Sequence, residues 1–167
     1  CERSCAELGL KAPAFLGFAD QRLDTLPQIE LTQAIEAMIK KHEPEVVYTH
    51  HFGDMNRDHQ VLHDATLVAC RAKPGAVVKR VLSYYVPSST DWAPALPHRA
   101  FLPNWFVDVS ATIKQKMRAL GHYALETPAY PHPRSLESIE NQAKFWGSSV
   151  GFEYAEPFVL VRNLTPK

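Results

Sequence analysis

A short apolar run that leads into a loop of histidines and carboxylates constrains this chain more than any other feature. Glu45 to Thr49 has the pattern of a buried strand, and the polar loop after it passes into a helical pattern that ends near Ala72. Asp58 is placed to cap that helix. Ionisable side chains gathered where a buried strand ends are the usual layout of an α/β active site. The segment therefore predicts an α/β fold with a site at this strand end.

The rest of the chain alternates strand and helix patterns. We expect strands at 15–18, 77–86, 105–109 and 157–162, and helices at 2–9, 28–42, 111–125 and 135–146, with Ser110 and Ser135 as caps of the last two helices. Such alternation predicts a mainly parallel sheet with helices on both faces. Ligands of such sheets bind beyond the carboxyl ends of the strands, so the loops 19–24, 49–59 and 87–103 are the expected site loops.

The composition argues against several classes of protein. The chain has 167 residues, which fits one domain, residues 1–167, with a sizeable core. Lys+Arg and Asp+Glu both number 18, and a formal net charge of zero argues against a nucleic-acid binder. No apolar run approaches the length of a membrane span. Cys1, Cys5 and Cys70 fit reduced thiols in the cytoplasm rather than a disulfide framework. Homo-oligomerisation stays open.

The loop after the first buried strand offers metal ligands. Neutral imidazole and carboxylate are the ligands that zinc and related divalent ions prefer. His59 follows a carboxylate at the start of the helix, and as a ligand it would need an acceptor for its other ring nitrogen, for which Asp58 or Asp54 is available. His63, one helical turn later, either shares a metal with His59 or is an ordinary histidine. Asn56 is either an amide donor to a developing oxyanion or a turn residue.

Two further loops carry polar side chains that suit either a sugar or an ordinary turn. One is the charged turn at 20–24, and the other sets hydroxyl groups beside Trp92. The candidates for substrate contact in these loops are Asp20, Arg22, Ser88, Ser89 and Thr90.

A proline-flanked loop near the end of the chain is also unusual. Pro131 and Pro133 stiffen the segment that carries His132 and Arg134. A planar guanidinium held in one direction suits a carboxylate, phosphate or sugar hydroxyl. The alternative is a stiff loop in which Arg134 pairs with a surface glutamate.

Several of these motifs occur together in one known family. They are the segments 16–24, 48–59 and 88–92, Phe101-x-Pro103-Asn104, Pro131-His132-Pro133-Arg134-Ser135 and Tyr154-Ala155-Glu156-x-Phe158. With them the chain resembles the LmbE-like (PIG-L) deacetylase family over nearly its whole length. The most specific are Asp54-x-Asn56-x-Asp58-His59 and the Pro-His-Pro-Arg-Ser motif.

The resemblance implies a Rossmann-like α/β fold and a zinc-dependent hydrolase that removes an acetyl group from an N-acetylated sugar or sugar conjugate. It implies that His59 is a zinc ligand and that Asp58 is the supporting carboxylate. Asn56 stands where the family often has a catalytic His, which favours an amide that donates to the oxyanion. With this activity, the expected substrate-binding residues are Asp20, Arg22, Asp54, Ser88, Ser89, Thr90, His132 and Arg134.

The sequence departs from the family in one respect. It contains no His-Pro-Asp-Asp-Glu motif, which in the family supplies two further zinc ligands and the general base. We expect this motif and the first strand of the fold upstream of Cys1, and we expect the chain alone to be inactive. The alternative is a catalytically inactive sugar-binding relative. A metal site built from His50, His51, His59 and His63 is the weakest reading, because adjacent strand residues point to opposite faces.

Overall fold

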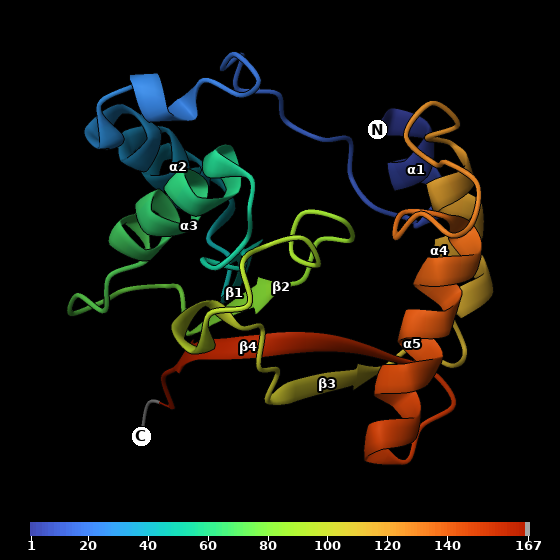
Figure 1. Ribbon diagram of the computed structural model, residues 1–167. Helices are drawn as coiled ribbons and strands as arrows, with labels where there is room; N and C mark the ends of the chain where they lie inside the picture. The colour runs from blue at the N-terminus through green and yellow to red at the C-terminus, as the bar shows by residue number, and fades with distance from the viewer. Residues whose placement is uncertain (166–167) are drawn as a thin grey trace. The chain divides into compact units, whose positions relative to one another are not determined.

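The computed structural model describes residues 1–165, which form two compact units. One unit holds residues 16–105 and the chain from residue 158 on, and the other holds residues 1–15 and 106–157. In chain order the elements are α1 (Glu2–Glu7), η1 (Leu23–Thr25), α2 (Gln28–His42), β1 (Val46–His50), α3 (Arg57–Ala69), β2 (Arg80–Tyr84), η2 (Pro97–Arg99), β3 (Trp105–Asp108), α4 (Ile113–Gly121), α5 (Leu136–Val150) and β4 (Ala155–Asn163), as Figure 1 shows.

The sheet has the strand order β1-β2-β4-β3. Strands β1 and β2 run parallel, with His50 opposite Tyr84 at their carboxyl ends. Strand β4 runs antiparallel to β2, with an irregularity between Val81 and Leu82. The α/β class predicted from the sequence is confirmed, and the sheet is mixed rather than mainly parallel. Apolar patterns along a chain mark where strands lie but not the direction in which each one runs.

Two predicted elements differ from the structure. Residues 10–19 form neither helix nor strand, so the strand predicted at 15–18 is wrong, and Phe15 stays exposed without a neighbouring strand to cover it. The helix predicted at 111–125 is shorter at both ends: it spans Ile113–Gly121, with Thr112 as its N-cap residue. Ser110 does not cap that helix, because its hydroxyl donates to Asp108 and accepts from the backbone of Tyr154.

The unit that contains β1 is held together by an apolar core between two helices. Helices α2 and α3 lie side by side in Figure 1 and contact each other. Leu31 of α2 packs there with Val61 and Ala65 of α3. Because α3 starts directly after the polar loop, this core fixes the position from which the loop's side chains project. None of the helices in the described part of the chain has the length and apolar character that a membrane crossing requires.

We predict that Leu31→Ala lowers the free energy of unfolding by about 2–5 kcal/mol, because it removes a buried side chain and leaves a cavity. Ile29→Ala on the same helix is the matched control, since Ile29 is 58% exposed and Leu31 is 2% exposed. The control should change stability by about 0.5 kcal/mol at most. Urea unfolding of both variants checks this, and equal losses would show that the α2–α3 core is not where the unit's stability lies.

Candidate active site

The candidate site forms where β1 passes into α3. Asn56 is the N-cap residue of α3, and its side-chain oxygen accepts a hydrogen bond of 2.9 Å from the Asp58 backbone. The prediction that Asp58 caps the helix is therefore wrong. Asp58 lies in the first turn, and its Oδ1 instead accepts a bond of 3.0 Å from the Leu23 backbone, which ties η1 to α3. Both Asn and Asp cap helices well, so the sequence alone left the choice between them open.

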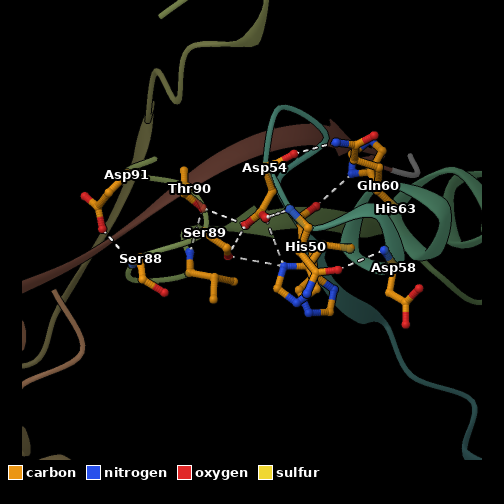
Figure 2. A network of polar contacts seen from close by, with 12 residues as sticks. His50, Asp54, Asp58, Gln60, His63, Ser88, Ser89, Thr90 and Asp91 are labelled. Carbon is orange, nitrogen blue, oxygen red and sulfur yellow. Dashed lines mark hydrogen bonds and ion pairs between the residues drawn. The ribbon is translucent and has the colours of Figure 1, made fainter. Parts of the chain in front are cut away.

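A buried carboxylate, Asp54, lies at the centre of the site (Figure 2). Its Oδ1 accepts a hydrogen bond of 2.7 Å from the Asn56 backbone and lies 3.2 Å from His59 Nδ1. Its Oδ2 accepts bonds of 2.8 Å from Ser89 Oγ and 2.9 Å from Thr90 Oγ1. Burial raises the pKa of Asp54, but the hydrogen bonds from His59, the Asn56 amide and Ser89 outweigh it and bring the pKa below its usual value. The carboxylate is therefore ionised.

The face of the His59 ring lies against His50. The two ring centroids are 4.1 Å apart with an interplanar angle of 19°. The Tyr84 hydroxyl lies 2.9 Å from His50 Nε2, while His50 Nδ1 is buried with no hydrogen-bond partner among the described residues. Burial, and after it the neighbouring His59, lower the pKa of His50 to about 4. His50 is therefore neutral at ordinary pH and provides an uncharged surface for the His59 ring.

His63 is a buried structural histidine. Its Nδ1 lies 2.8 Å from the backbone oxygen of His50, and its side chain is largely buried. This contact favours the second of the two roles considered for His63. Within residues 1–165, no three His, Cys, Asp or Glu side chains lie close enough to hold a metal ion, so a site built from the four loop histidines finds no support.

His59 has the surroundings of a single metal ligand. Its Nδ1 faces the Asp54 carboxylate, and a ligating histidine usually directs its second nitrogen to such an acceptor. That arrangement leaves Nε2 for a metal. The described residues fit one ligand position and do not supply a complete set.

A pocket of about 390 Å³ opens beside these residues. It is lined by Gln21, Asp24, Met55, Asn56, Arg57, Asp58, Ser88, Ser89 and Trp92. Gln21 and Ser88 have positive φ angles of 53° and 75°, which non-glycine residues rarely adopt and which cluster at functional sites. The pocket therefore combines polar groups and an aromatic ring with locally strained backbone.

The predicted substrate-binding residues differ in how they are related to this pocket. Ser88 and Ser89 line the pocket, whereas Asp54 and Thr90 are not among its lining residues, and Thr90 donates a hydrogen bond to Asp54. Asp20 and Arg22 flank Gln21, and Asp20 lines a separate, mainly apolar hollow next to α2. Gln21 was missed by the sequence reasoning. Glycine or asparagine would have signalled a positive φ at that position, and glutamine gives no such signal.

His132 and Arg134 belong to the other compact unit. Arg134 Nη1 lies 2.8 Å from Glu126 Oε2 in an exposed ion pair, and the Arg134 backbone donates to His132 Nδ1 at 3.1 Å. Exposed pairs of this kind contribute about 0–1 kcal/mol. The structure thus shows the surface glutamate that the sequence offered as the alternative, and substrate contact stays a prediction. Ser135 caps α5 as predicted, by accepting from the Ser138 backbone.

Gly53 allows two loops to approach each other closely. His51 Nε2 lies 3.0 Å from the backbone oxygen of Arg99, and Arg99 Nη2 donates to the backbone oxygen of Asp54 at 3.1 Å. A Cβ atom on Gly53 would lie 2.0 Å from the Arg99 oxygen and 2.6 Å from His51 Nε2. Only glycine leaves room for the η2 turn against this loop.

We predict that Gly53→Ala destabilises the protein by about 1–3 kcal/mol, because backbone atoms of Arg99 must move to admit the methyl group. Gly121→Ala is the control, since a Cβ there meets no atom within 4 Å. Thermal unfolding of both variants checks this. A Gly53→Ala protein as stable as the control would mean that the loops can separate without cost.

The sequence of this chain is similar to one protein family and to a deacetylase. Residues 1–70 match the PIG-L family, described as GlcNAc-PI de-N-acetylase. The uncharacterized deacetylase YaiS of Escherichia coli is 34% identical over 95 residues, which cover 54% of this chain and 47% of that protein. The matched region thus spans about half the length of this curated relative. The resemblance to the LmbE-like (PIG-L) family that the motifs predict is confirmed.

Solved structures share the fold. The conserved protein TT1542 of Thermus thermophilus matches with a TM-score of 0.76 and 24% identity, covering 99% of this chain and 72% of that one. The N,N'-diacetylchitobiose deacetylase of Pyrococcus horikoshii matches with a TM-score of 0.73 and 18% identity, covering 96% of this chain and 61% of that one. At these identities the likeness shows the fold alone.

Proposed function

We propose that this chain, which resembles the LmbE-like (PIG-L) family, is part of a hydrolase that removes the acetyl group from an N-acetylated sugar or sugar conjugate. The observation that carries the proposal is the placement of His59 and Asn56 on one helical turn beside the pocket. Ser89, which lines the pocket, lies 3.5 Å from His59 Nδ1. The family match covers this segment, since it extends over residues 1–70. A cytoplasmic location belongs to the same proposal, because Cys1, Cys5 and Cys70 are all free thiols.

In this proposal His59 provides one zinc ligand through Nε2. Two further ligands and the general base would have to come from outside the described residues. When bound, the ion would polarise the acetyl carbonyl and lower the pKa of a water molecule. The remaining roles are those of this chain's own side chains.

Asn56 is suited to donate a hydrogen bond to the oxyanion. Its Oδ1 is used as the helix cap, so its Nδ2 is the group that can donate, and no described residue accepts from it. A donor fixed in this way needs no reorganisation as negative charge develops on the acetyl oxygen. Asp58 acts from the same turn by holding the 23–25 segment against the start of α3.

The pocket suits a hydroxylated ring. Ser88, Ser89 and Asp24 offer donors and acceptors, and Trp92 offers an aromatic face. Asp20 and Arg22 flank the lining residue Gln21, and Asp54 accepts hydrogen bonds from the lining residue Ser89 and from Thr90. Substrate contact by His132 and Arg134, which belong to the other compact unit, stays a prediction.

Acetate release from N-acetylglucosamine conjugates by the intact, zinc-loaded protein tests the proposal. Release of one acetate for each free amine formed would support it. Binding of the conjugate without acetate release would favour the inactive sugar-binding relative. Failure both to bind and to hydrolyse a panel of N-acetylated sugars would overturn the proposal.

We predict that Asn56→Asp lowers kcat roughly 100- to 1,000-fold, the usual effect of losing one oxyanion donor. Aspartate keeps the cap, so the melting temperature should stay close to that of the wild type. Asn56→Ala, which loses both the cap and the donor, should lower kcat and the melting temperature together. Unchanged kcat in Asn56→Asp would remove Asn56 from the catalytic set.

A further inference from the structure

The His59 ring is fixed from two directions. Its edge meets the Asp54 carboxylate, with 3.2 Å between Nδ1 and Oδ1. Its face lies on the neutral His50 ring, which is itself held by the Tyr84 hydroxyl. These two contacts hold the ring in one orientation. Whether the group at the ring edge accepts or donates a hydrogen bond then decides which ring nitrogen carries the proton.

Asp54 presents only acceptors to that edge. Its carboxylate is completely buried and accepts hydrogen bonds at both oxygens, and a carboxylate that only accepts offers no proton to its neighbour. Its Oδ2 is occupied by the hydroxyl groups of Ser89 and Thr90, and the Asn56 backbone occupies one position on Oδ1. The position left on Oδ1 faces His59 Nδ1, which must therefore be protonated to satisfy it.

Asp58 does not perform this task. Although it is the sequence neighbour of His59, its Oδ1 accepts from the Leu23 backbone. No described contact joins its carboxylate to the His59 ring. The Asp58 carboxylate therefore contacts η1, and the Asp54 carboxylate is the one that contacts the His59 imidazole.

We propose that Asp54 is the positioning residue that keeps His59 protonated at Nδ1 and so leaves Nε2 unprotonated toward the reaction. Ser89 and Thr90 hold the Asp54 carboxylate in that orientation, which couples the pocket-lining loop at 88–90 to the state of the imidazole. The inference deepens the proposed function, on which the use of His59 rests, but the protonated nitrogen can be measured without any activity.

The measurement is a long-range proton–nitrogen NMR spectrum of the imidazole rings in the full-length, metal-free protein, recorded at mildly alkaline pH. The His59 signals are identified by their loss in His59→Gln. We expect the wild type to show His59 predominantly protonated at Nδ1. Because the metal is absent, that state would be due to the protein alone. A wild-type ring protonated at Nε2 would overturn the inference by itself.

Three variants separate Asp54 from its neighbours. In Asp54→Asn the amide oxygen must remain at the Oδ1 position, because the Asn56 backbone can only donate, and the amide NH₂ faces hydroxyl groups that can accept. Asp54→Asn should therefore keep the Nδ1-protonated form. Asp54→Ala, which has no acceptor, should lose it. Asp58→Asn is the matched control and should leave the His59 signals unchanged.

The outcomes are distinguishable from those of the functional test. A change of the protonated nitrogen in Asp58→Asn, or its persistence in a folded Asp54→Ala protein, would contradict the inference whatever the activity. If Asp54→Ala does not fold, the wild-type and Asp58→Asn spectra still test whether Asp54 sets the protonated nitrogen of His59. A protein with the expected wild-type spectrum and no deacetylase activity would contradict the proposed function alone.

Discussion

The site depends on the burial of one ionised carboxylate. Removing a charge from water is strongly unfavourable unless hydrogen-bond donors surround it. Asp54 meets this requirement with the Asn56 backbone, two hydroxyl groups and the edge of His59. Each of these donors belongs to a segment that must be in place before the carboxylate can be buried. The geometry of the site therefore follows from the need to provide hydrogen-bond donors for the Asp54 carboxylate.

Several other features of the structure serve the same requirement. The hydroxyl donors of Ser89 and Thr90 lie on the loop after β2, which runs parallel to β1, so both loops leave the sheet at the same edge. The backbone oxygen of Asp54 accepts from Arg99 and from Gln60. The contact with Arg99 is possible because Gly53 lets the η2 turn approach. The α2–α3 core then fixes the helix that carries His59.

The sequence predicted the parts of this arrangement that are local. The strand at 45–49 and the helix after it depend on residues within one short segment. The roles proposed for Asn56 and His59 depend on the same segment and stay predictions. The acceptor for His59 was left open between Asp54 and Asp58, because the answer depends on Ser89 and Thr90, which are 35 and 36 positions from Asp54. The apolar run at 15–18 has a composition that suits a strand, but no partner strand accompanies it within residues 1–165. The positive φ angle of Gln21 could not be predicted, because glutamine is not a residue that favours this conformation.

The most direct test of the account is the zinc content of the intact protein after the metal is removed with a chelator and supplied again. His59 is the zinc ligand that we propose, whereas His63 has a structural role, because its Nδ1 already contacts the His50 backbone oxygen. We therefore expect His59→Ala to fail to recover zinc, while folded His63→Ala recovers the wild-type amount. Full zinc binding by His59→Ala, or equal loss in both folded variants, would contradict this expectation.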